Sequence, residues 1–208
     1  MHAHLIFAHP NLHSLNGLLR DTALETLQQL GLSVSVSDLY QLNFKASADK
    51  GDFTQLHNEA FFDLQVEQKM ARLNGTFTPD IQREQTLLEQ AELIIFQFPL
   101  WWESTPALVK GYIDRVFSVG WAYGGAKALA DKRVLVSTST GAPEMSWTTD
   151  KRGTIEQLFK PLLVGSFEFC GMEALKPFVV YSAKSLSEEG RAEAIKRYQA
   201  YLHTIVQS

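Results

Sequence analysis

A short apolar run at residues 93–98 constrains the fold of this chain more than any other stretch. The run (LIIFQF) is stopped by Pro99, and a polar and aromatic loop follows it. Apolar residues then recur at helical spacing up to residue 117, behind Thr105 as the expected N-cap and Pro106 as the expected first helical residue. A buried strand, a loop and an amphipathic helix in this order are half of a parallel βαβ unit.

The rest of the chain repeats this alternation. Four further strands are predicted, at residues 3–8, 33–39, 133–139 and 177–181. Four further helices are predicted, at residues 16–30, 79–92, 154–169 and 185–206. Strands that alternate with helices form a parallel sheet with helices on both faces. We therefore predict one α/β domain over residues 1–208, and five strands fit the flavodoxin-like order 2-1-3-4-5 better than a six-stranded dinucleotide fold.

Residues 40–78 do not fit the alternation. The segment contains a turn-like stretch at residues 48–52 and a charged piece at about 55–73 that has helical character. It is too long for an ordinary connection in a compact domain, which predicts a functional or interfacial role.

Composition excludes several classes of protein. The chain has 208 residues, 45% of them hydrophobic, which suits a globular domain, and a net charge of −4, which argues against nucleic acid as a partner. No window approaches the roughly 18 apolar residues of a membrane span, and the amino terminus is too polar for a signal peptide. We therefore expect a protein that is not integral to a membrane. The single cysteine excludes an internal disulfide, so we expect a cytoplasmic location.

Three loops, after the first, third and fourth strands, are predicted to meet at the carboxyl edge of the sheet. The first loop, residues 9–16, leads into the amino terminus of a helix, where free N–H groups favour a phosphate. Ser14, Asn16 and His9 can add side-chain donors there. The alternative is that Ser14 or Asn16 only caps the helix.

The other two loops are suited to a flat ligand. Trp101 and Trp102 follow a buried strand directly, which favours contact with a ring system, although paired tryptophans more often pack in a core or interface. In the third loop, Gly141 and Ala142 follow Thr140, and their small side chains let a ligand approach the backbone.

Metal, thiol and hydrolase sites are not predicted. The four histidines near the amino terminus lie along a strand and a loop, a spacing that does not bring them together. Cys170 has no histidine partner in sequence and is expected to be a buried structural thiol. Residues 150–152 (DKR) are expected to form a solvated loop, although a cation there could meet the phosphates of a nicotinamide cofactor.

At these loops the chain resembles the flavodoxin-like NAD(P)H:quinone oxidoreductases. This family includes the DT-diaphorase type, the bacterial drug-activity modulators and the ancillary oxidoreductases of potassium-efflux systems. The resemblance covers nearly the whole chain. Its motifs are AHPNLHSLN (8–16), SDLYQLNF (37–44), TPDIQREQTLLEQAELIIFQFPLWW (78–102), PALVKGYIDRVFSVGWAYG (106–124), STSTGAP (137–143) and FEFCGME (167–173).

The resemblance implies a homodimeric flavoprotein that passes hydride from NADH or NADPH to flavin N5 and then to a quinone in the same pocket. Four residues of the first loop would hold the flavin phosphate region, namely His9, Ser14, Leu15 and Asn16. The second loop would lie along the isoalloxazine through Pro99, Leu100, Trp101 and Trp102. The third would donate backbone hydrogen bonds to the ring, from Ser139, Thr140, Gly141 and Ala142.

The quinone is expected to meet Trp102, Trp147 and Tyr123, of which Tyr123 matches an aromatic residue that caps the partner subunit's pocket. Mammalian members carry a tyrosine and a histidine proposed to assist hydride transfer. Those places fall near Trp147 and Gly153, so no catalytic residue is assigned here. Glu103 stands where the mammalian type has an aromatic residue, and its role is open.

The long 40–78 segment resembles FAD-binding members, whereas GWAYGG (120–125) resembles the FMN-binding ancillary proteins. FAD is the preferred prediction and FMN the alternative. The alternative function is a flavin-binding ancillary subunit that regulates a potassium-efflux type transporter as a peripheral partner. The physiological acceptor, a quinone or a nitro or azo compound, is left open.

Overall fold

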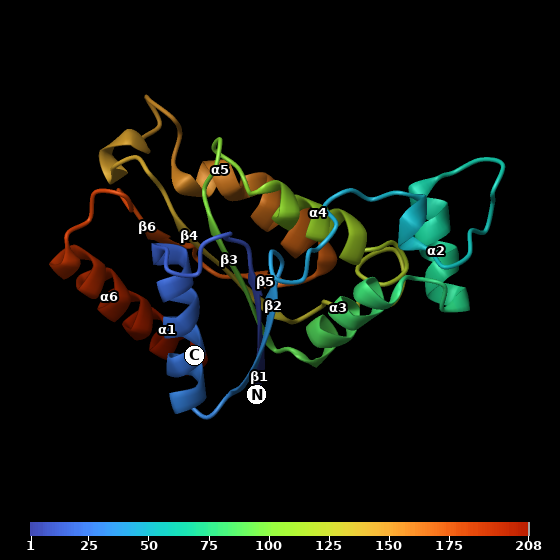
Figure 1. Cartoon of the computed structure of the whole chain (residues 1–208), viewed down its shortest axis with the longest axis horizontal. Helices are drawn as coiled ribbons and strands as arrows, with labels where there is room; N and C mark the ends of the chain where they lie inside the picture. The colour runs from blue at the N-terminus through green and yellow to red at the C-terminus, as the bar shows by residue number, and fades with distance from the viewer. Residues whose placement is uncertain (208) are drawn as a thin grey trace.

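A parallel sheet forms the centre of the computed structural model, which describes residues 1–207 (Figure 1). Its strands are β1 (His2–Phe7), β2 (Ser33–Asp38), β3 (Leu93–Pro99), β4 (Arg133–Ser139), β5 (Glu173–Ala174) and β6 (Phe178–Val180). The order is β2-β1-β3-β4-β5, with β6 also paired to β4, and every pairing is parallel. The predicted α/β class and strand order are therefore confirmed.

The fifth position of the sheet is split, where the sequence predicted one strand at 177–181. Arg133 and Val134 pair with β5, whereas residues 137–139 of β4 pair with β6. Pro177 lies at the break, and proline has no N–H to donate to a strand ladder. The strand predicted at 177–181 is therefore β6, and β5 is an additional two-residue strand that was not predicted.

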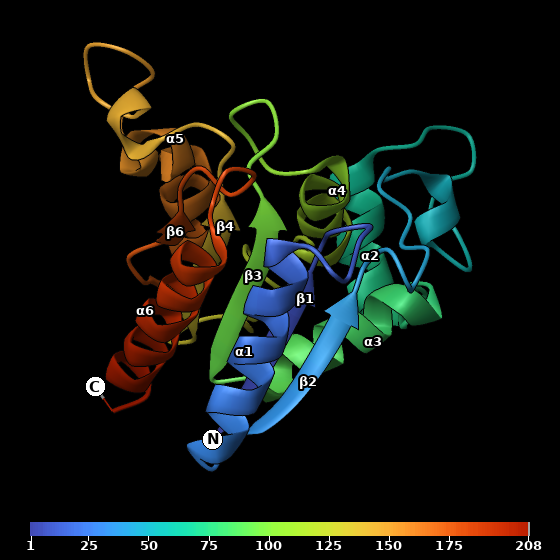
Figure 2. The same ribbon diagram turned by 60° about the vertical axis from the view of Figure 1, so that its left-hand side comes forward.

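Helices cover both faces of the sheet, as predicted. On one face, α1 (Leu15–Gln29) and α6 (Glu188–Gln207) pack against apolar side chains of β1 and β3 such as Leu5 and Ile95. On the other face lie α3 (Pro79–Gln90), α4 (Ala107–Val116) and α5 (Ile155–Leu162), around Phe96 and Phe98. Figure 2 shows α1 and α6 in front of the strands and α3 and α4 behind them. None of the described helices combines the length and apolar character needed to cross a membrane.

Several helix boundaries differ from the predictions. The helix expected at 154–169 is α5 followed by a π-helical turn (Leu163–Phe167) and a 3₁₀ turn (Glu168–Cys170). Pro161 lies inside α5 and removes one helical N–H donor, which is consistent with the change of pitch that follows. Pro106, not Thr105, is the N-cap residue of α4.

The 40–78 segment contains less helix than its charge pattern indicated. After the 3₁₀ turn η1 (Lys50–Asp52), helix α2 spans only Leu64–Asn74. Residues 55–63 are not helical because Asp63 caps α2 by accepting hydrogen bonds from Gln65 and Val66.

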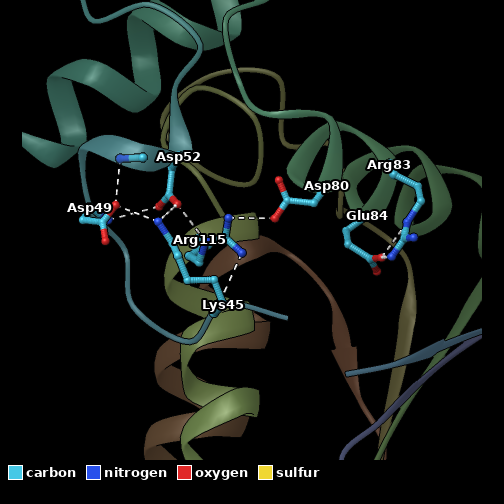
Figure 3. A network of polar contacts seen from close by, with 8 residues as sticks. Lys45, Asp49, Asp52, Asp80, Arg83, Glu84 and Arg115 are labelled. Atoms are coloured by element: carbon cyan, nitrogen blue, oxygen red, sulfur yellow. Dashed lines mark hydrogen bonds and ion pairs between the residues drawn. The ribbon is translucent and has the colours of Figure 1, made fainter. Parts of the chain in front are cut away.

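A buried cation fastens this segment to α4. Arg115 is 2% exposed; its Nε lies 2.9 Å from Asp52 Oδ1 and its Nη2 lies 2.8 Å from Asp80 Oδ2 (Figure 3). Its third hydrogen bond reaches the carbonyl oxygen of Lys45 at 3.2 Å. One turn earlier, a Cβ at Gly111 would lie 2.0 Å from the carbonyl oxygen of Ala46, so only glycine lets the segment lie directly on the helix.

Candidate active site

The loops after β1, β3 and β4 meet at the carboxyl ends of the strands (Figure 2), as the sequence predicted. Between them lies a cavity of about 500 Å³, here called the first cavity. Ten of the twelve residues predicted to hold a cofactor line it, namely His9, Ser14, Leu15, Asn16, Pro99, Leu100, Trp101, Ser139, Thr140 and Gly141. The predicted convergence of the three loops is thus seen in the structure.

A chain of buried amides ties the three loops together. Gln97 Nε2 donates to Asn16 Oδ1 at 2.9 Å, and Asn16 Nδ2 donates to Ser139 Oγ at 2.9 Å. Gln97 and Asn16 are 0% and 3% exposed. Both polar ends of the Asn16 side chain are therefore bonded within the protein, which gives this residue a positioning role, and its second Nδ2 N–H stays available for the predicted contact with a ligand.

The first loop supplies a helix terminus. Ser14 is the N-cap of α1, and its hydroxyl oxygen accepts from the backbone N–H of Gly17. The first N–H groups of a helix have no partners within the helix, and they attract anions. A Cβ at Gly17 would lie 1.8 Å from the carbonyl oxygen of Leu12, so glycine is needed for the loop to fold back on α1. Capping by Ser14 and an anion site are both compatible with this geometry.

Two cations also line the first cavity, and they come from the end of the chain. Lys184 precedes α6 and Arg191 lies in its first turn. Neither residue has an ion-pair partner among the described residues. Together with His9 and His13, they give the α1 end of the cavity the chemistry of a phosphate site.

The second loop is a tight turn with an exposed tip. Trp101 and Ser104 exchange backbone hydrogen bonds of 3.1 and 3.0 Å, and the turn residues Trp102 and Glu103 have φ of 52° and 55°. Positive φ at both central residues is typical of mirror-image hairpin turns, which prefer Asn-Gly. Trp102 is fully exposed, whereas Trp101 lines the first cavity, 6.1 Å from the His9 ring.

Only some of the third-loop residues that were predicted to donate backbone hydrogen bonds have a free N–H group. The N–H of Thr140 already donates to the carbonyl oxygen of Val180, and the Thr140 hydroxyl donates to that of Ala142. No hydrogen bond within the described residues uses the N–H of Gly141 or of Ala142. These two groups are therefore the donors that the third loop can offer to a ligand.

A second cavity of about 430 Å³ adjoins the first and shares Leu100, Thr140 and Gly141 with it. Its other lining residues are Trp102, Glu103, Ala142, Trp147 and Arg152. Trp102 and Trp147, both predicted to meet a substrate, thus line one cavity. Gly153, near which the resemblance places the histidine of the mammalian members, does not line it; the neighbouring Arg152 does.

Tyr123 lies elsewhere. It lines a separate cavity of about 500 Å³ with residues of α2, α4 and the turn after α5, and its ring lies 5.3 Å from that of Phe169. Within one chain it does not reach the predicted quinone position, so it could contribute there only from a second copy.

Sequence reasoning did not find four lining residues of these two cavities: His13, Ala183, Lys184 and Arg191. The loop after the last strand was not considered, although its carboxyl end lies at the same edge of the sheet as the other three. The basic residues Lys184 and Arg191 beside that strand were the available signal.

The sheet is parallel and doubly wound, and the two adjoining cavities lie at the carboxyl ends of its strands. They are cationic at the α1 end and aromatic at the other. These features define a protein of flavodoxin-like type. Residues 1–202 match a family model described as Flavodoxin-like fold, and the chain belongs to this family.

Comparison with proteins of known name shows which members of this family the chain is similar to. Over 208 aligned residues the chain is 36% identical to ribosyldihydronicotinamide dehydrogenase [quinone] of Pongo abelii, covering 97% of this chain and 90% of that protein. It is 32% identical to NAD(P)H dehydrogenase [quinone] 1 of Rattus norvegicus, covering 97% and 76%. A Klebsiella pneumoniae protein, provisionally described as a quinone reductase, has a crystal structure that aligns with a TM-score of 0.95 at 34% identity, covering 100% of this chain and 86% of that one. The resemblance to the quinone oxidoreductases of this family is confirmed.

Proposed function

We propose that the protein is an NAD(P)H dehydrogenase (quinone) that carries a flavin and reduces quinones by two electrons in a ping-pong cycle. The observation that carries this proposal is the convergence of a helix terminus with Lys184 and Arg191 at one end of a cavity, and of aromatic and small residues at the other. The first end suits the phosphate of a flavin and the second suits its ring.

The residues present fit such a cofactor in both charge and shape. The α1 terminus, Lys184 and Arg191 would hold the phosphate. Leu100 and Trp101 would lie along one side of the ring, and the free N–H groups of Gly141 and Ala142 would donate to its polar edge. The bound flavin would supply the hydride chemistry, and the single cysteine of the chain offers no dithiol pair that could carry two electrons in its place.

The protein's own part in the reaction is placement. The Gln97–Asn16–Ser139 chain fixes the three loops relative to one another, so that the walls of the cavity are formed before a ligand arrives. Trp147 and Trp102 line the adjoining cavity, where a nicotinamide and a quinone would bind in turn. One shared cavity would make the oxidised nicotinamide leave before the quinone binds, which is the order of a ping-pong cycle.

We further propose a homodimer in which Tyr123 covers the partner's substrate cavity, because within its own chain it lies beside Phe169, outside both site cavities. FAD is the proposed cofactor and FMN the alternative, on the strength of the long 40–78 segment.

The test is to purify the protein, release and identify its flavin, and follow flavin absorbance while NADH or NADPH and then a quinone are added. Bleaching by the nicotinamide and recovery with the quinone are expected. A protein that binds neither FAD nor FMN after reconstitution would refute the proposal. Rapid turnover with free quinones would also separate it from the alternative of an ancillary transporter subunit, for which stable binding to a transporter and little turnover are expected.

The phosphate assignment has its own variant. Arg191→Gln should weaken flavin binding by about tenfold, because it removes one charge-assisted hydrogen bond to an anion. The measurement is a titration of the apoprotein that follows flavin fluorescence, with Arg197→Gln as the control on the same helix outside the first cavity.

The proposed dimer is tested by mixing two impaired chains, Tyr123→Ala and Arg191→Gln, at a flavin concentration too low to load Arg191→Gln alone. In a mixed dimer, one site combines an intact Arg191 with the partner's intact Tyr123, so activity should return. No recovery on mixing would place Tyr123 outside the partner's site.

A further inference from the structure

An ion pair joins two walls of the second cavity. Arg152 Nη1 lies 3.1 Å from Glu103 Oε1, although the residues are 49 positions apart, on the turn after β3 and the loop after β4. Glu103 and Arg152 are the only charged residues among those that line this cavity. The charge that the cavity offers to a ligand therefore depends on whether this pair is closed or open.

The Glu103–Arg152 ion pair contributes little to the folding stability of the protein. Its side chains are 50% and 46% exposed, and ion pairs at such exposure are largely screened by water and salt. Glu103 is also held at a φ of 55°, next to Trp102 at 52°, in a conformation that side-chain-bearing residues rarely adopt. Strain of this kind persists mainly at functional sites. A strained turn that packs nothing into the core points to a role in the cavity beside it.

Arg152 also has a defined aromatic neighbour. Its guanidinium carbon lies 5.7 Å from the centre of the Trp147 ring, and Trp147 is 7% exposed. A guanidinium beside an aromatic wall suits a planar ligand with an anionic substituent, because the ring can pack on the wall while two N–H groups bind the anion.

We propose that Arg152 is a specificity-determining residue that binds an anionic substituent (sulfonate, carboxylate or phosphate) of an aromatic ligand in the second cavity, and that Glu103 competes with this substituent for the guanidinium. The inference rests on the proposed function, because the ligand is taken to be the acceptor or the nicotinamide donor. Both sources share the same chemistry, an oxyanion on a ring-bearing molecule.

The two partners of the pair should act in opposite directions. With flavin-loaded enzyme and NADH, Arg152→Gln should raise the KM for 1,4-naphthoquinone-2-sulfonate on the order of tenfold, with kcat unchanged. Glu103→Gln should lower the same KM about threefold, because it frees the guanidinium. The KM for neutral 2-methyl-1,4-naphthoquinone should change less than about twofold in both variants. A merely structural ion pair would instead give changes of the same sign in both variants and for both quinones.

Matched controls come from the same loop. Lys151→Gln and Glu144→Gln each remove one charge near the cavity without removing a residue that lines it. Both should leave the ratio of the two KM values within about twofold at physiological salt, where distant surface charges are screened. Arg152→Lys, which keeps the charge and loses the planar fork, should fall between the wild type and Arg152→Gln.

Two further measurements complete the test. NADH and NADPH are compared with the neutral quinone as acceptor. If Arg152→Gln raises the KM for NADPH alone, the bound anion is the 2′-phosphate of NADPH; if it raises the KM for both donors, the bound anion is their shared pyrophosphate. Calorimetric titration with naphthalene-2-sulfonate and its neutral sulfonamide reports binding without turnover, and only the sulfonate should lose affinity in Arg152→Gln. Equal affinity for the sulfonate in wild type and Arg152→Gln, together with unchanged KM values, would overturn the inference while quinone reduction stood. A wild type that oxidises no NADH would overturn the proposed function and leave the calorimetric result to be judged alone.

Discussion

Replacing Glu84 by glutamine should remove a buried negative charge on which the stability of the sheet and α3 depends. Glu84 is 0% exposed. Its Oε2 accepts from the hydroxyls of Ser37 at 2.6 Å and Tyr112 at 3.0 Å, its Oε1 accepts from Arg83 (Figure 3), and His4 Nε2 lies 3.7 Å away. Burial alone would raise the pKa of Glu84, but the contacts with His4, Ser37 and Arg83 outweigh it and lower the pKa from 4.5 to about 2.

The pKa difference sets the size of the effect. From 4.5 to about 2, at 1.36 kcal/mol per pKa unit, it corresponds to about 3 kcal/mol of folding free energy. Because the folded-state pKa lies below the unfolded one, this stability is present above pH 5 and is lost as the pH falls toward 2. Linkage gives a loss of roughly 0.8 kcal/mol by pH 4 and roughly 2 kcal/mol by pH 3.

The assay is urea unfolding followed by circular dichroism, for wild type and Glu84→Gln, between pH 7 and pH 3. The variant should be about 2–3 kcal/mol less stable at pH 7, and the gap should shrink as the pH falls, because only the wild type loses the charge. Glu25→Gln, on an exposed position of α1 without an ion pair among the described residues, should match the wild type throughout. A gap below about 0.5 kcal/mol at pH 7, or one that does not shrink in acid, would refute the reasoning.

Three other substitutions test the frame of the site. Arg115→Met should cost about 2–4 kcal/mol in urea unfolding, because Asp52 and Asp80 lose the guanidinium and the buried Asp52 carboxylate keeps only Lys45 as a cation; an unchanged midpoint would count against the anchoring role. Asn16→Ala should cost about 1–3 kcal/mol through the unpaired buried groups it leaves, and should weaken flavin binding in a fluorescence titration more than an exposed Asn74→Ala does. Gly17→Ala should displace the first loop, because its Cβ would lie 1.8 Å from a backbone oxygen; tight flavin binding by this variant would contradict that expectation.

The sheet order and the meeting of three loops could be predicted because they follow from local patterns and topology. An apolar run such as residues 93–98 needs no knowledge of its neighbours to be recognised as a buried strand, and the order 2-1-3-4-5 fixes which loops share an edge. The role of Asn16 could not be predicted in this way. Whether its amide faces a ligand or Gln97 depends on side-chain directions that the sequence pattern does not contain.

Residues that act over long separations were the least predictable. Arg115 and Asp52 are 63 positions apart, and nothing in the periodicity of α4 distinguishes a buried arginine from an exposed one. Glu103 had no assigned role because its partner Arg152 lies in another loop, within a short charged run typical of solvated surface. The break between β5 and β6 was also not predicted; it contains Pro177, and whether a proline interrupts a strand depends on which side of the strand needs a donor.

That split has a consequence for how the protein behaves in concentrated solution. The outer strand of an open sheet can recruit the backbone of another molecule, and the hazard grows with the length of uninterrupted edge. Here one margin of the sheet consists of a two-residue and a three-residue strand, with Leu175, Lys176 and Pro177 between them. A foreign strand would find no continuous ladder there, so the gap at residues 175–177, with the N–H that Pro177 lacks, protects this margin against intermolecular strand pairing.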